Sequence, residues 1–287
     1  MLGWLNSWLY KSMGREPPPA REAPPPLPQD PWSRQWRALR NVLIAIVMVG
    51  VVGAVAGGAW LLLGHRASDW AVIVVAGDWH AHDGGPTEGF DNARRDVSAA
   101  LTSIGFKADN ILQFSARPED YPSEHVQPSD TQTLAVALLG LSQKTSAGCL
   151  LYFSSHGAPN GVLLGGQFLT PDTLSRMLDQ TCGTRPTVVI VSACFSGTFV
   201  PVLKGDNRMI LTAARPDRTS FGCGQDNKYP FFDTCVLATI HAVHGFPELA
   251  DKVRACVAQR EADTGMSPPS EPQVFVGAKI AAALPRW

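Results

Sequence analysis

Two features that the sequence lacks narrow the possible functions. It has six cysteines, but no two of them are spaced as Cys-x-x-Cys. This absence argues against a zinc ribbon and against a thioredoxin-type redox centre. The 24 lysines and arginines nearly balance the 25 aspartates and glutamates, so the net charge is −1. With no basic excess and no basic stripe beyond the N-terminal region, we expect no nucleic-acid partner.

Charge is also missing from one long stretch near the N-terminus. Val42–Leu63 is 22 residues without a single charged side chain. As a helix it is ~33 Å long, enough to cross the apolar core of a bilayer. A buried helix of a soluble protein is the alternative, but the length of the run and its charged flank favour a membrane span.

The basic residues around this span are distributed unequally. Arg66 is the only one close behind it, whereas six precede it: Lys11, Arg15, Arg21, Arg34, Arg37 and Arg40. The positive-inside rule therefore predicts a cytoplasmic N-terminus, with everything after His65 outside the cytoplasm.

A cleaved signal peptide is the alternative interpretation, because Ala54–Val55–Ala56 resembles a cleavage site. The preceding ~40 residues are far too long for an ordinary n-region, which favours an uncleaved signal anchor. The expected organisation is a cytoplasmic proline-rich tail (1–41), a transmembrane segment (42–63) and an extracytoplasmic domain (68–287). In a bacterium that domain is periplasmic.

The tail and the span contain three further patterns. Met1–Gly14 carries apolar residues at helical spacing, which fits either a short interfacial helix or a frayed terminus. Glu16–Pro31 contains Pro-Pro-Pro twice and is expected to be a semi-rigid linker. Gly53 and Gly57 form a Gly-x-x-x-Gly pair, a candidate contact for homodimerisation in the membrane.

From Trp70 onward, short apolar runs alternate with amphipathic segments. Strands are expected at Ala71–Ala76, Asn110–Phe114, Cys149–Ser154, Thr187–Ser192, Met209–Ala213 and Gln273–Val276. Helices are expected at Phe90–Ile104, Thr131–Gln143, Pro171–Asp179, Phe231–Val243 and Leu249–Glu261, with a hairpin at Gly157–Gly166. This alternation predicts an α/β sheet covered by helices on both faces.

Two of these strands end in residues that carry chemistry. Cys149–Ser154 leads into His156, and Thr187–Ser192 leads into Cys194. A single helix joins the two strands, so we expect them to be parallel and adjacent, ~4.8 Å apart. His156 and Cys194 would then project from the same edge of the sheet.

A cysteine beside a histidine is a candidate nucleophile. The thiolate is the reactive form, and a nearby imidazole can supply or stabilise it. The N–H groups of Gly157 and Cys194 are candidates for stabilising an oxyanion. A buried structural cysteine with an unrelated surface histidine is the alternative.

The same residues resemble the legumain-type (asparaginyl endopeptidase) family, which has the caspase–haemoglobinase fold and includes the GPI-anchor transamidase subunit. Ser155-His156-Gly157 and the stretch Ser192–Gly197 carry the resemblance, supported by Trp70–Gly77 and Leu211–Cys223. The resemblance covers roughly residues 70–277. It implies a caspase-like three-layer sandwich with a mostly parallel sheet, His156 as general base or imidazolium partner, Cys194 as nucleophile, and no cofactor.

Two positions depart from the family pattern. Legumains carry a glutamate two residues before the cysteine, where this sequence has Ser192. They also carry an arginine in the loop after the first strand, and Trp79–Phe90 contains none. Asparagine specificity is therefore not implied. A polar substrate pocket is predicted instead, lined by Ser155, Ser192, Thr219 and Ser220.

Two further histidines and the other five cysteines are interpreted without a catalytic role. His80, His82 and Asp83 are crowded into four residues, so they are expected to be exposed loop residues and not a metal site. If Cys194 stays reduced, at most two disulfides can form. Cys149 is predicted to be a buried thiol because it lies within a strand. The candidate disulfide partners are Cys182, Cys223, Cys235 and Cys256, with their connectivity open.

The sequence thus predicts a membrane-anchored cysteine endopeptidase acting on polypeptides. Cys194 would form a thioester acyl-enzyme, His156 would protonate the leaving amine, and water would release the acyl group. A transpeptidase of the same mechanism, with an amine in place of water, is one alternative. A catalytically silent caspase-fold interaction module is another. A thiol-redox protein is a third, without a reactive Cys-x-x-Cys to support it.

Overall fold

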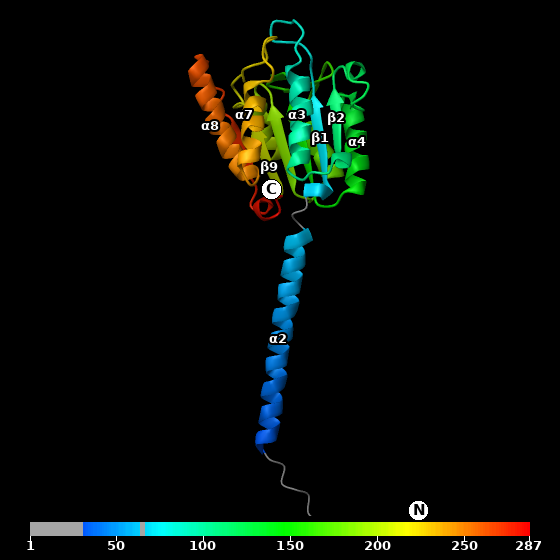
Figure 1. The fold of residues 1–287 in the computed structure, drawn as a ribbon, viewed down its shortest axis with the longest axis vertical. Helices are drawn as coiled ribbons and strands as arrows, with labels where there is room; N and C mark the ends of the chain where they lie inside the picture. The colour runs from blue at the N-terminus through cyan, green and yellow to red at the C-terminus, as the bar shows by residue number, and fades with distance from the viewer. Residues whose placement is uncertain (1–30, 64–66) are drawn as a thin grey trace, which may run out of the picture. The chain divides into compact units, whose positions relative to one another are not determined.

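The computed structural model describes residues 31–63 and 67–287 (Figure 1). The chain divides into two compact units, 1–56 and 57–287. The described part of the first unit, residues 31–56, is helical, and the second unit contains an α/β domain.

The long helix α2 spans Pro31–Leu63, so it begins well before the apolar run at Val42. Its window Gln35–Gly53 is long and apolar enough to cross a membrane, and the side chains there are exposed. Apart from the helix's own nearby backbone and the two adjacent residues, no heavy atom lies within 4 Å of the position where a Cβ on Gly53 would stand. The surroundings of Gly57, the expected helix at Met1–Gly14 and nearly all of the expected linker lie outside the described residues.

The α/β domain is built around one seven-stranded sheet with the strand order β10-β9-β8-β4-β1-β2-β3. The strands of this sheet are β1 (Trp70–Ala76), β2 (Ile111–Ser115), β3 (Gln127–Pro128), β4 (Gly148–Ser154), β8 (Thr187–Ser192), β9 (Arg208–Thr212) and β10 (Gln273–Val276). All neighbouring pairs are parallel except β9 and β10. A second, three-stranded antiparallel sheet contains β5 (Gly157–Ala158), β6 (Gly161–Leu164) and β7 (Gln167–Leu169).

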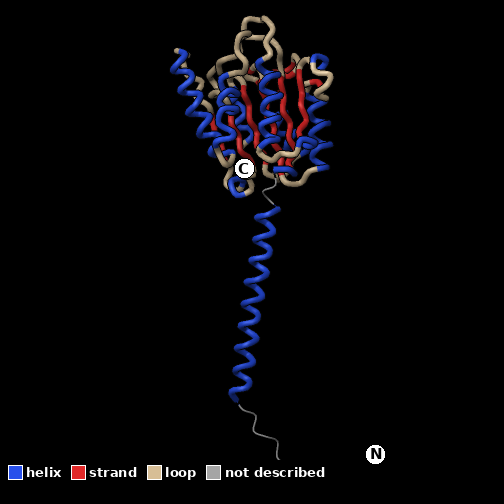
Figure 2. The backbone as a smooth tube through the Cα atoms, viewed as in Figure 1, coloured by secondary structure: helices blue, strands red, loops and turns tan. Residues whose placement is uncertain are grey.

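Helices cover both faces of the large sheet, which makes three layers (Figure 2). One face packs against α3 (Gly89–Ser103), α7 (Phe231–Thr239) and α8 (Phe246–Thr264). The other packs against α4 (Thr131–Lys144), α5 (Pro171–Thr181) and α6 (Phe199–Leu203). Every residue of β1, β4 and β8 is buried, because a parallel strand in the middle of such a sandwich has no solvent-facing side.

The predicted α/β architecture is confirmed, and most element boundaries agree within one or two residues. The expected strands at Thr187–Ser192 and Gln273–Val276 coincide with β8 and β10. Thr170 caps α5 by accepting a hydrogen bond from the Thr173 N–H, with Pro171 in the first turn. Helix α8 extends three residues beyond the expected segment at each end.

Two disulfides hold helices of this domain in place. Cys149 in β4 is bonded to Cys182 at the end of α5, and Cys235 in α7 is bonded to Cys256 in α8. The prediction that Cys149 is a free buried thiol is therefore wrong. Its burial was correctly expected, but Cys182 lies at the C-terminal end of a helix that packs directly on this part of β4. Cys194 and Cys223 are unpaired.

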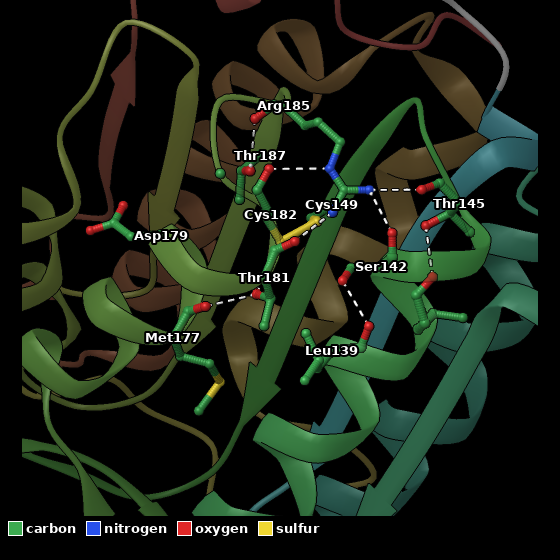
Figure 3. The surroundings of a disulfide bond; sticks show 12 residues. Leu139, Ser142, Thr145, Cys149, Met177, Asp179, Thr181, Cys182, Arg185 and Thr187 are labelled. Atoms are coloured by element: carbon green, nitrogen blue, oxygen red, sulfur yellow. Dashed lines mark hydrogen bonds between the residues drawn. A yellow bond between two sulfur atoms is a disulfide. The ribbon is translucent and has the colours of Figure 1, made fainter.

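Arg185 reinforces the region around the first disulfide (Figure 3). Its guanidinium donates to four backbone carbonyls that lie at or just beyond the C-terminal ends of α4 and α5: Ser142, Thr145, Thr181 and Cys182. The last carbonyls of a helix have no partner within the helix, so a cation at this position satisfies them. Disulfide and guanidinium together fix both helices against the sheet.

The disulfide arrangement predicts which thiols react. In denaturant without a reductant, iodoacetamide should alkylate only Cys194 and Cys223, and after reduction all six cysteines should react. Intact mass and peptide mapping count the adducts. Alkylation of Cys149 or Cys256 before reduction would contradict the pairing.

Candidate active site

The candidate catalytic residues follow two neighbouring strands at matched positions. β4 and β8 are parallel, with Ser154 opposite Ser192, as expected from the sequence. The Ser155 N–H donates to the Ser192 carbonyl at 3.1 Å and continues the pairing past the end of β4. His156 and Cys194 each lie two residues beyond the Ser154–Ser192 pair, at the carboxyl edge of the sheet.

Gly157 brings the two strand ends into direct contact. A Cβ on Gly157 would stand 2.1 Å from the Cys194 carbonyl oxygen and 3.0 Å from the Cys194 neighbour Ala193. Only a residue without a side chain allows the backbone after His156 to approach this closely. The histidine segment therefore packs on the backbone of the cysteine itself.

Cys194 lies in a sharp turn that is held by the loop after β9. The next residue, Phe195, has φ of 56°, a left-handed conformation that is uncommon for a side chain of this size. Its N–H donates to the Arg218 carbonyl at 2.8 Å. The Ser220 N–H lies 3.3 Å from the Cys194 Sγ, and the Ser220 Oγ lies 3.6 Å from it. Such a turn after a strand presents a nucleophile at the sheet edge.

His156 is oriented by a backbone carbonyl. Its Nε2 lies 2.8 Å from the carbonyl oxygen of His80, in the loop after β1. Because a carbonyl oxygen only accepts, Nε2 carries a proton in this arrangement, and the neutral ring keeps Nδ1 as its acceptor. The ring also packs edge-on against Phe90, with centroids 5.1 Å apart.

The loop after β1 is ordered by its own side chains. Asp78 accepts hydrogen bonds from the N–H groups of Trp79 and His80 and lies 2.7 Å from the His80 Nδ1. Asp83 accepts from the side chain of Gln225 at 3.0 Å, and His82 is exposed. Within residues 31–63 and 67–287, no group of three His, Cys, Asp or Glu side chains is arranged to hold a metal ion.

The predicted pocket residues lie in two different environments. Ser220 contacts Cys194, and Thr219 beside it is exposed. Ser155 and Ser192 are each 2 % exposed. Their hydroxyl groups donate to the Leu163 carbonyl at 2.7 Å and to the Asp233 carboxylate at 2.9 Å. A substrate-binding role for all four residues stays a prediction.

Cys223 is a second unpaired thiol near the site. Burial and the neighbouring Cys194 raise the pKa of Cys223 to about 12. Its carbonyl accepts from the His82 N–H at 3.2 Å, so this residue joins the β9–α7 loop to the loop after β1. A thiol with so high a pKa is almost wholly protonated at neutral pH and is a poor nucleophile.

Sequence reasoning did not single out Asp233. This side chain is 0 % exposed and accepts hydrogen bonds from the hydroxyl groups of Tyr152, Ser154 and Ser192. Burial raises the pKa of Asp233 to about 6, although the three hydrogen bonds act to lower it. An aspartate on the apolar face of a helix, between Phe232 and Cys235, was the available signal.

Comparisons with known proteins agree with this geometry. A sequence model of the Peptidase C13 family matches residues 103–245, a range that contains β4, β8, His156 and Cys194. No curated protein matches the chain in sequence. Among solved structures, caspase-1 from Spodoptera frugiperda is similar in fold. The match has a TM-score of 0.54 and 15 % identity, and it covers 74 % of this chain and 87 % of that chain. The chain therefore belongs to the Peptidase C13 (legumain) family of cysteine peptidases and has the caspase–haemoglobinase fold.

Proposed function

We propose that this protein is a membrane-anchored endopeptidase in which Cys194 is the nucleophile and His156 its proton-transfer partner. The observation that carries the proposal is the pairing of Ser154 with Ser192 on adjacent strands. Because of this pairing, His156 and Cys194 lie at matched positions, each two residues beyond the pair. The contact of Gly157 with the Cys194 carbonyl supports the same assignment.

The distribution of protons between the two ring nitrogens of His156 fits this chemistry. With Nε2 engaged by the His80 carbonyl, Nδ1 is the nitrogen that takes the thiol proton and later delivers it to the leaving amine. The thiolate attacks the peptide carbonyl carbon, the C–N bond breaks, and a thioester remains on Cys194. Water then releases the acyl group and restores the thiol. A peptide amine in place of water would give transpeptidation.

The oxyanion formed during this attack needs hydrogen-bond donors. In the β5–β6 pair the Leu163 N–H donates to the His156 carbonyl, so by the alternation of an antiparallel ladder the Gly157 N–H points away from β6. We assign the Gly157 and Cys194 N–H groups to this role. For the substrate side chain, Thr219 and Ser220 are the best placed of the predicted pocket residues.

Removing either member of the pair tests the proposal. With the full chain in detergent, Cys194→Ala and His156→Ala should each lower kcat/KM for a peptide library by at least about 10³-fold, because neither the thiolate nor the proton transfer can be replaced by water. His82→Ala is the matched control: it removes an exposed histidine from the neighbouring loop and should leave activity unchanged. Undiminished cleavage by Cys194→Ala would sink the proposal and favour a silent interaction module.

The anchor and its orientation are a second part of the proposal. We place residues 1–41 in the cytoplasm, the span within α2 and the peptidase domain from residue 68 outside it. The two disulfides support this placement, because disulfides persist in oxidising compartments and are rare in the cytoplasm. Gly53 and Gly57 remain the proposed contact for a dimer of anchors.

Protease protection tests the orientation. In cells whose outer envelope has been permeabilised while the cytoplasmic membrane stays intact, added protease should degrade the α/β domain. A fragment that contains residues 1–41 should remain. A reporter fused to the N-terminus should be protected in the same preparation. Protection of the domain together with loss of the N-terminal reporter would reverse the assignment.

A further inference from the structure

One carboxylate joins the two strand ends that carry the candidate catalytic pair. The Asp233 Oδ2 accepts from the Ser154 Oγ at 2.7 Å and from the Ser192 Oγ at 2.9 Å, so a single oxygen bridges β4 and β8. The other oxygen, Oδ1, accepts from the Tyr152 hydroxyl, also on β4. The carboxylate comes from α7, which packs on this face of the sheet.

The bridge lies at the last residue pair of the two strands. Ser154 and Ser192 are register partners and the last paired residues of β4 and β8. One further main-chain bond follows, from the Ser155 N–H to the Ser192 carbonyl. His156 and Cys194 come next, about 7 Å along each strand from the bridge. The side-chain bridge therefore sits where the main-chain ladder ends and the candidate active site begins.

We propose that Asp233 is a positioning residue: its carboxylate ties the ends of β4 and β8 together and so fixes the placement of His156 relative to Cys194. The inference rests on the proposed function of that pair. Asp233 does not contact the substrate in this account and acts only through the two serines.

The cost of burying this group supports a role beyond packing. Among the described residues only three hydroxyl groups bond to the carboxylate, and no lysine or arginine pairs with it. Burial raises the pKa of Asp233 from 3.8 to about 6. The folded chain therefore holds a proton there between pH 3.8 and about 6 that the unfolded chain has released, so ionisation destabilises the fold as the pH rises through this window.

At neutral pH an uncharged isostere would avoid this cost and fill the same space. If Asp233 served only to hold α7 on the sheet, such a replacement would make the folded protein more stable. A carboxylate, however, accepts all three hydroxyl hydrogen bonds, whereas the amide of asparagine has N–H donors in place of one oxygen, so the hydroxyl groups on that side must turn and accept instead. The titratable groups that face Asp233 are the Tyr152 hydroxyl on β4 and the Cys223 thiol in the loop before α7.

The first test is Asp233→Asn in the full chain in detergent, with active sites counted by titration with a thiol-directed irreversible inhibitor. We expect kcat per titrated site to fall about 10- to 100-fold, as misplacement of reacting groups by about 1 Å does, with KM within about 2-fold of the wild type. The unfolding midpoint at pH 7.5 should be no lower than that of the wild type, because the buried charge is gone. A purely structural residue would lower the number of titrated sites and leave kcat per site unchanged.

Three further variants keep the test decisive if Asp233→Asn folds poorly. Ser154→Ala and Ser192→Ala each remove one arm of the bridge and should also lower kcat per site. Tyr152→Phe is the matched control, because it removes the third hydroxyl from the same carboxylate and leaves both arms in place, so its kcat should match the wild type. In the Asp233→Asn background, Ser154→Ala should cause little further loss.

Two results would overturn the proposal: unchanged kcat per site in both serine variants, or a loss in Tyr152→Phe as large as in Ser154→Ala. Failure of the proposed function is a separate result. It would appear as cleavage that persists in Cys194→Ala, whereas failure of the bridge alone would leave cleavage dependent on Cys194 and insensitive to Ser154 and Asp233.

Discussion

The in-register pairing of β4 with β8 is the constraint on which the candidate active site depends. Leu150 to Phe153 on one strand lie opposite Val188 to Val191 on the other, and all of these side chains are buried. A shift of one residue would exchange the two faces of a strand and move apolar side chains away from the helices they pack on. Packing of the core therefore also fixes the register of the residues that follow, His156 and Cys194.

Loops at the carboxyl edge of the sheet supply the contacts that orient His156 and Cys194. The His80 carbonyl orients the histidine ring, and the Arg218 carbonyl holds the turn that presents Cys194. Ser220, in the same loop as Arg218, contacts the sulfur through its N–H. These partners come from loops after β1 and β9, so the site is assembled from four strand ends. Ser192, at the place of the family's glutamate, directs its hydroxyl to a fully buried carboxylate. This position, two residues before Cys194, therefore presents no exposed acid.

Much of this arrangement follows from the sequence because continuous apolar runs mark buried strands. The strand ends at His156 and Cys194, the parallel order of β4 and β8, and the helices on both faces were predictable for that reason. The partners of His156 and Cys194 were not, because a backbone carbonyl such as that of His80 leaves no mark in a sequence. The free-thiol prediction for Cys149 failed for a related reason: strand position predicts burial, but a disulfide depends on which helix end packs against the strand. Asp233 was missed because its role appears only when α7 is placed on the sheet.

The most direct measurement of the central claim is the site at which a peptidyl electrophile, such as a peptidyl chloromethyl ketone, attaches to the full chain in detergent. The account predicts one adduct per chain, on the Cys194 sulfur, formed only by the folded protein and lost in His156→Ala, while Cys223 stays unmodified at neutral pH because its thiol remains protonated. An adduct on Cys223, or labelling of Cys194 at the same rate without His156, would contradict the assignment of the catalytic pair.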